Sequence, residues 1–310
     1  MKKVKDIDPS KIKSPSELVD ALYAGGGFSA KNIGIGMDIL EKMIKDKDCK
    51  KFLSFPACIV ATGTRGVLKE IVKRKLVDVI ITTCGTLDHD IARSLGEYEH
   101  GNFFADDAKL HKRKILRLGN IFIPSAKYGP AIEKFMQPIL SKLYNSGKRE
   151  LSTKELSWEI GKALDKNSIL YWAYKNKIPV YVPGITDGAV GSQLWMFGQD
   201  HNFKIDLLKD EQELADIVFT AKRTGALMIG GGISKHHTIW WAQFKSGLDY
   251  AVYITTAPEY DGSLSGARLR EAVSWGKVKE KARYVTIEGD ATLILPLIIS
   301  ALLERVKSLR

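Results

Sequence analysis

Residues 257–278 bring together several side chains that could do chemistry. The stretch reads APEYDGSLSGARLREAVSWGKV, with three glycines, several carboxylates and Lys277 two residues after Trp275. Glycines at this density allow positive φ and close approach of the backbone to a ligand. A lysine beside a tryptophan can act as an amine held against an apolar wall. On spacing alone a surface turn before a short helix, with a solvated lysine, is the favoured interpretation, because isolated lysines are usually exposed.

Polar residues and glycines also follow five predicted strands. Such residues at the carboxyl ends of parallel strands are the expected geometry of an open α/β site. Taken singly, Asp290 is read equally well as the N-cap of the last helix. His236 and His237 are adjacent, so they point in different directions, which argues against a two-histidine metal site and leaves one of them for acid–base work. The five segments are Thr83-Cys84-Gly85, Thr186-Asp187-Gly188, Gly230 to His237, Thr255-Thr256-Ala257 and Glu288 to Ala291.

The elements that must position these residues alternate between strand and helix. Apolar, β-branched runs at 77–82, 178–182, 226–229, 250–255 and 284–287 predict buried strands. The alternation predicts a doubly wound, mostly parallel sheet with helices on both faces, a Rossmann-like α/β fold. No GxGxxG motif is present, so the usual dinucleotide fingerprint is absent. Two helical patterns near the N-terminus predict a helical extension, and residues 1–16 read as a flexible basic arm before one α/β domain from 17 to 310.

The composition excludes several classes. The chain has 310 residues, a formal charge of +11 and three cysteines without CxxC spacing. This cysteine pattern argues against a disulfide framework or a zinc site and fits a reducing cytoplasm. Neither a secretory signal nor an 18-residue apolar run occurs, so we expect no membrane span. The lysines are scattered rather than clustered among aromatic residues, so nucleic acid is not the expected partner.

The run Glu271 to Lys277, EAVSWGK, resembles the C-terminal signature of the deoxyhypusine synthase family, in an archaeal-type sequence. GGGISKHH, TDG, the Thr256-Ala257 pair and the Asp290-Ala291 pair resemble further motifs of that family, from about Phe52 to Leu302. The resemblance implies NAD-dependent transfer of the 4-aminobutyl group of spermidine to one lysine of a translation factor. It also implies a homotetramer with active sites at a dimer interface, and a basic arm that can cover a site entrance.

The resemblance also assigns roles to individual residues. It makes Lys277 the covalent nucleophile, which forms an imine, and His236 the group that holds or removes the amine proton. Spermidine is a polycation, so carboxylates suit its ends and an aromatic face suits an ammonium. The implied cofactor-binding residues are Ala61, Thr62, Thr83, Cys84, Gly85, Asp187, Thr256, Ala257, Asp290 and Ala291. The implied substrate-binding residues are Asp88, His89, Asp261, Gly262, Ser263, Glu271 and Trp275.

Several positions depart from the family pattern. Asp88 and His89 stand where better-known members carry paired glutamates, and Ser192 and Leu264 replace carboxylates. We favour Asp88 as the replacement acid, in the loop after strand 77–82, with Glu259 and His89 as the other candidates. The altered acids keep a second hypothesis open, an aminobutyltransferase that acts on a small amine to make homospermidine or a similar product. A non-catalytic NAD-binding paralogue is a third.

Overall fold

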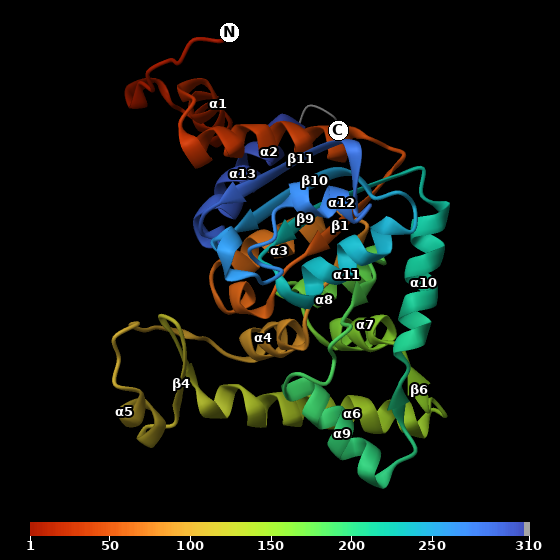
Figure 1. The fold of residues 1–310 in the computed structure, drawn as a ribbon. Helices are drawn as coiled ribbons and strands as arrows, with labels where there is room; N and C mark the ends of the chain where they lie inside the picture. The colour runs from red at the N-terminus through yellow and green to blue at the C-terminus, as the bar shows by residue number, and fades with distance from the viewer. Residues whose placement is uncertain (307–310) are drawn as a thin grey trace. The chain divides into compact units, whose positions relative to one another are not determined.

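The computed structural model describes residues 1–306 and contains a six-stranded main sheet (Figure 1). The strand order is β11-β10-β9-β1-β2-β7. The pairs β10–β11, β9–β10, β1–β9 and β2–β7 are parallel. The predicted fold class, a parallel sheet flanked by helices, is confirmed. The strands are β1 (Cys49–Ser54), β2 (Val79–Ile81), β7 (Val180–Tyr181), β9 (Arg223–Ile229), β10 (Leu248–Thr255) and β11 (Val278–Glu288).

Two small sheets accompany the main one. The first is a three-stranded antiparallel sheet of β3 (Glu99–His100), β5 (Ile121–Pro124) and β4 (Ile115–Leu118). A further pair joins β6 (Glu150–Leu151) and β8 (Lys204–Ile205). The sequence did not predict β3 or β4, because each is short and largely unburied and therefore lacks an apolar period.

The chain forms two compact units. The first comprises Met1–Phe55, Leu76–Val79 and the chain from Leu214 onward, and the second comprises Pro56–Lys75 and Ile80–Glu213. The single domain expected from 17 to 310 stays a prediction. Helix α10 (Leu207–Thr220) continues from the second unit into the first.

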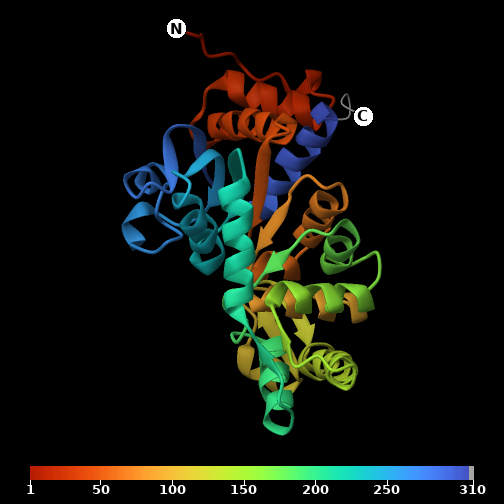
Figure 2. The same ribbon diagram turned by 90° about the vertical axis from the view of Figure 1, so that its right-hand side faces the viewer.

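In the first unit, helices cover both faces of the strands. Val252 of β10 packs on Gly36 of α2, whereas the next residue, Tyr253, faces Lys235 of α11. Neighbouring strand residues point to opposite faces, so α2 and α11 lie on opposite sides; Figure 2 shows α13 and α11 likewise separated by the strands. The predicted N-terminal extension is confirmed, with Ser14 capping α1. The helices are α1 (Pro15–Gly25), α2 (Phe28–Lys45), α11 (Gly232–Gln243), α12 (Leu269–Ser274) and α13 (Ala291–Val306).

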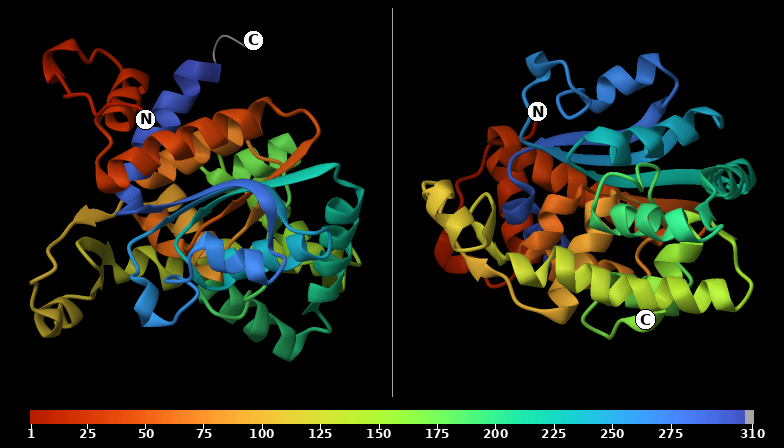
Figure 3. Two further views of the ribbon diagram at one scale, coloured as in Figure 1. Left: turned by 45° about the horizontal axis from the view of Figure 1, so that its top comes forward. Right: turned by 90° about the horizontal axis from the view of Figure 1, so that it is seen from below.

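The second unit is mostly helical. Its centre is α4 (Cys84–Leu95), whose residues Thr86 to Ala92 are all buried. Helices α6 and α9 pack against each other, and so do α7 and α8 (Figure 3). The unit also contains the 3-10 turn Ala57–Ala61 before α3. Its helices are α3 (Thr64–Lys73), α4, α5 (Asp107–Lys112), α6 (Gly129–Asn145), α7 (Thr153–Ala163), α8 (Ile169–Asn176) and α9 (Ala189–Asp200).

Candidate functional site

Lys277 lies in a cavity of about 300 Å³ in the first unit. Its residue is 8% exposed, and its Nζ lies 5.0 Å from the ring centroid of Trp275 and 5.7 Å from that of Trp240. The backbone fixes this position, since Lys277 N donates to the carbonyl of Ala272 at 2.9 Å. The preceding Gly276 has φ +67°, which favours glycine. Lys277 is therefore a largely buried residue whose amine lies near two indole rings, rather than the solvated lysine that spacing alone favours.

Other groups that can act on an amine line the same cavity. His236 comes from α11, with its ring 5.7 Å from that of Trp240. Burial and the neighbouring Lys277 lower the pKa of His236, which favours the neutral imidazole that can accept a proton. Glu271 and Trp275 come from α12 and its C-terminal end. The full lining is Lys235, His236, Ile239, Trp240, Leu264, Ala267, Arg268, Glu271, Ala272, Trp275 and Lys277.

In the first unit, three of the predicted substrate-binding residues do not line this cavity. Asp261, Gly262 and Ser263 form an exposed turn beside it, and Asp261 accepts hydrogen bonds from the backbone N–H and the hydroxyl of Ser263 at 2.7 and 2.8 Å. Their substrate role stays a prediction. The sequence missed Lys235 and Trp240 as cavity residues. Trp240 had a usable signal, because it lies four residues after His236 on one helix face.

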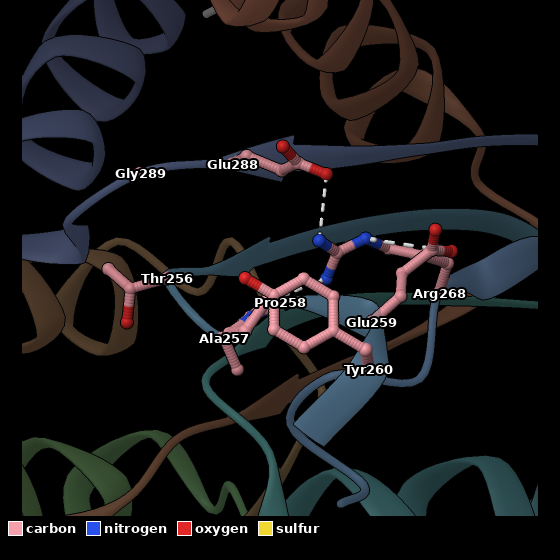
Figure 4. Close-up of a pocket in the computed structure, with 8 residues that line it drawn as sticks. All are labelled: Thr256, Ala257, Pro258, Glu259, Tyr260, Arg268, Glu288 and Gly289. Atoms are coloured by element: carbon pink, nitrogen blue, oxygen red, sulfur yellow. Dashed lines mark hydrogen bonds and ion pairs between the residues drawn. The ribbon is translucent and has the colours of Figure 1, made fainter. Parts of the chain in front are cut away.

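A second cavity of about 440 Å³ lies at the carboxyl ends of β10 and β11 (Figure 4). Arg268 crosses it, 2.8 Å from Glu288 and 4.0 Å from Glu259, and its guanidinium donates to the carbonyl of Ala257 at 2.9 Å. The predicted cofactor residues Thr256 and Ala257 line it. Its lining residues are Thr256, Ala257, Pro258, Glu259, Tyr260, Arg268, Glu288 and Gly289.

The donor set at these strand ends fits part of a dinucleotide. Carboxylates at strand ends accept from ribose hydroxyls, and the N-terminus of a long helix favours a phosphate. Glu288 and Asp290 are exposed carboxylates here, and α13 begins at Ala291. Asp290 also accepts from the N–H of Thr292 at 2.7 Å, so it has the capping contact that the sequence left open.

In the second unit, five of the predicted cofactor residues lie at the start of α4 or at the end of the 3-10 turn that packs against α4. Thr83 is the N-cap residue of α4, and its hydroxyl accepts from the N–H of Ala57 at 3.2 Å. Arg93 donates to the carbonyls of Val60 and Thr62 and so holds the preceding turn. Burial raises the pKa of the Cys84 thiol to about 12, so Cys84 is not a nucleophile. The residues gathered here are Ala61, Thr62, Thr83, Cys84 and Gly85. Asp187 is exposed in the turn after β7. Burial, with a smaller contribution from the charge of Asp187, raises the pKa of Asp88.

The expectation that Asp88 and His89 lie in a loop is wrong, because both are buried on α4. Asp88 Oδ1 accepts from the N–H of Val190 at 2.8 Å, and Oδ2 from the N–H of Ala189 at 2.9 Å. Tyr128 donates to the same carboxylate at 3.0 Å. Asp88 thus caps the N-terminus of α9, and its substrate role stays a prediction.

His89 has a protein partner as well. Its Nδ1 is 2.9 Å from the hydroxyl of Tyr98, and burial, with the charge of Arg93, lowers the His89 pKa to about 4. Ser192, at the position of another lost acid, is exposed and donates to the carbonyl of Gly188 at 3.1 Å. Within residues 1–306, no helix is long and apolar enough to cross a membrane, and no group of three metal-binding side chains occurs.

The family model for deoxyhypusine synthase matches residues 17–302 of this chain. A Picrophilus torridus protein named "Probable deoxyhypusine synthase" is 58% identical over 303 residues, covering 97% of each chain. One of the same name from Thermoplasma acidophilum is 54% identical over 302 residues, again covering 97% of each.

Solved structures agree in fold. A deoxyhypusine synthase from Entamoeba histolytica superimposes with a TM-score of 0.66 at 22% identity, covering 96% of each chain. AgrE, solved with ornithine and NAD⁺, gives a TM-score of 0.54 at 14% identity over 92% of this chain and 34% of AgrE. These two likenesses concern the fold alone, whereas the family match and the archaeal relatives extend over nearly the whole sequence. The chain belongs to the deoxyhypusine synthase family.

Proposed function

We propose that this protein is an NAD-dependent deoxyhypusine synthase, which transfers the 4-aminobutyl group of spermidine to one lysine of a translation factor. The observation that carries the proposal is the largely buried Lys277, whose amine lies near two tryptophans in a cavity that Glu271 and His236 also line. Family membership supports the reaction class. NAD, when bound, accepts a hydride from the carbon beside the secondary amine of spermidine and later returns it.

The residues of the cavity divide the work. The Glu271 carboxylate binds the primary ammonium of the aminobutyl end, and Trp240 and Trp275 enclose the methylene chain. His236 takes the proton from the secondary amine of spermidine as that amine becomes an imine. Lys277 Nζ then attacks the imine carbon, 1,3-diaminopropane leaves, and the aminobutyl group remains on Lys277 as an imine.

The transfer finishes when the target lysine attacks the same carbon and Lys277 departs as the amine. The new imine on the translation factor would then be reduced to a stable secondary amine by the hydride that bound NAD would supply. In the first unit we assign cofactor binding to Thr256, Ala257, Asp290 and Ala291. In the second we assign it to Ala61, Thr62, Thr83, Cys84, Gly85 and Asp187. We also infer a homotetramer, which sedimentation equilibrium tests.

Trapping with borohydride tests the nucleophile. Protein, NAD and labelled spermidine are incubated, reduced and digested, and we expect the label on the peptide that contains Lys277. Lys277→Arg removes the nucleophile and is expected to abolish labelling and turnover. Lys279→Arg is the matched control, since Lys279 lies two residues away and pairs with Asp249 at 2.6 Å. Label elsewhere, or turnover by Lys277→Arg, contradicts the proposal.

The acceptor is tested separately. The same mixture is supplied either with the translation factor or with a small diamine such as putrescine. Transfer to the protein lysine alone is the expected result. Faster transfer to the diamine favours the small-amine transferase. The observation that keeps this second function open is that Glu271 is the single carboxylate among the cavity-lining residues.

A further inference from the structure

Lys235 is a fully buried lysine that the proposed reaction does not use. It lies in the first turn of α11, is 1% exposed and lines the Lys277 cavity. Its Nζ donates to the carbonyls of Leu264 and Ala267 at 2.8 and 2.6 Å and lies 3.8 Å from the ring centroid of Tyr253. Burying an ammonium costs free energy unless it is paired in this way. These contacts are therefore needed to hold Lys235 in its buried position.

The segment that Lys235 binds is held through its backbone. The carbonyls of four consecutive residues, 264 to 267, each accept a hydrogen bond from a side chain outside the segment. Tyr253 and Thr255 donate to the carbonyl of Ser265 at 2.6 and 2.9 Å, and Arg268 donates to that of Gly266 at 3.2 Å. Lys235 binds both ends of the segment, at Leu264 and Ala267.

The same segment packs directly on the glycines before α11. A Cβ on Gly231 would collide with the backbone of Ser265. Arg268 follows the segment, and α12 begins at Leu269. The position of residues 264–267 therefore sets where α12 starts, and α12 carries Glu271 and leads to Lys277.

The charged and titratable groups that face Lys235 are Glu271, Arg268, Lys277 and His236, with Tyr253 from β10. Burial, which outweighs the attraction of Glu271, lowers the Lys235 pKa to about 8. Lys235 is therefore mostly protonated at neutral pH and loses its charge just above it.

We propose that Lys235 is a positioning residue for the transfer reaction: its ammonium clamps residues 264–267 and thereby holds α12, with Glu271, and the approach to Lys277 in the reactive arrangement. The inference rests on the proposed role of Lys277. It predicts that the loss of Lys235 slows formation of the Lys277 adduct although Lys277 itself is intact.

The chain offers a matched control just beyond the C-terminal end of α11. Lys245 also donates to two backbone carbonyls, those of Phe219, at 2.7 Å, and Ala221, but it does not line the cavity. Lys235→Met and Lys245→Met each remove one lysine clamp and keep an unbranched side chain. Only the first removes a clamp at the cavity.

Two measurements distinguish a positioning role of Lys235 from a general effect on folding. In hydrogen exchange of the protein without cofactor, we expect faster exchange at 264–272 in Lys235→Met and at 219–223 in Lys245→Met. In the borohydride assay, Lys235→Met is expected to form the Lys277 adduct at least about tenfold more slowly, the equivalent of one lost charged hydrogen bond. Lys245→Met is expected to match the wild type. The wild-type rate should change near pH 8 as Lys235 titrates, and this inflection should be absent from Lys235→Met.

Each outcome has a distinct meaning. If Lys235→Met matches Lys245→Met in the rate of adduct formation and in hydrogen exchange at 264–272, the proposed positioning role of Lys235 is wrong. If the wild type forms no adduct, the proposed function fails, while the exchange comparison still decides the clamp. If Lys235→Met does not fold, Lys235→Gln, which keeps a donor without the charge, is measured in the same way, and a wild-type rate for it overturns the role of the ammonium.

Discussion

Two regions of this molecule collect the same kinds of side chain and use them differently. The cavity around Lys277 contains a carboxylate, a histidine and two aromatic rings, and so does the buried side of α4. In the cavity these are Glu271, His236, Trp240 and Trp275. On α4 and the residues that pack against it they are Asp88, His89, Tyr98 and Tyr128.

The difference is whether the polar atoms have protein partners. Both oxygens of Asp88 accept hydrogen bonds within the protein, and His89 pairs with Tyr98. Among residues 1–306, the Glu271 carboxylate has no hydrogen-bond partner within the protein; it is exposed and lines a cavity. Residue type alone therefore does not distinguish the proposed site, whereas a polar group without a protein partner does.

The largest expected effect is the contribution of His89 to the pH dependence of stability. Its folded pKa of about 4 lies below the ordinary 6.5, so the unfolded chain binds more protons between these values. The free energy of unfolding therefore rises with pH across this window, and about 3 kcal/mol is lost on acidification from pH 6.5 to 4. Urea unfolding of His89→Asn at several pH values should lack this slope. The exposed His100→Asn should retain it; if both variants retain it, His89 is not buried as neutral imidazole.

Asp88→Asn should lower stability and leave the KM for spermidine nearly unchanged. The substituted amide cannot accept from all the donors that face Asp88, and leaving one of them unsatisfied costs roughly 2 kcal/mol. Urea unfolding and spermidine kinetics on the same protein preparation measure both effects. The substrate role that the sequence suggested for Asp88 requires a raised KM with unchanged stability. That result would contradict the contrast drawn between Asp88 and Glu271.

Glu271→Gln should do the opposite. Loss of one charge-assisted hydrogen bond to the ammonium raises the KM for spermidine roughly tenfold or more, while the free energy of unfolding stays close to that of the wild type. Steady-state kinetics measure the first effect and urea unfolding the second. Glu259→Gln is the control, since Glu259 lies outside the Lys277 cavity and pairs with Arg270. An equal rise in KM for Glu259→Gln would move the ammonium site to the strand-end cavity.

The smallest expected effect concerns Asp290. Asp290→Ala removes the capping bond to Thr292 and should cost about 1 kcal/mol of stability. We expect NAD affinity, measured by titration calorimetry, to fall as well. Loss of stability with unchanged NAD affinity would leave Asp290 a cap and nothing more.

Much of the fold followed from the sequence. The β-branched runs gave the buried strands because a parallel sheet covered on both faces requires apolar residues throughout. Lys277, His236, Glu271 and Trp275 came from one motif and one glycine-rich turn, and they share a cavity. Asp88 was misplaced because a polar stretch after a strand looks like a loop, whereas here its carboxylate is satisfied by the start of α9, about a hundred residues later. Long-range hydrogen bonds of this kind leave no local period in the sequence.

The hydrogen bonds to the carbonyls of residues 264–267 leave the side chains of this segment free to vary. Because the segment is fastened by its main chain, the Leu264 side chain has no part in the fastening, and it is 39% exposed at the cavity wall. The amino acid at this position can therefore be exchanged without a change in the backbone conformation. Natural variation or laboratory engineering can thus alter the charge offered to an incoming amine at position 264 while the architecture beneath it stays the same.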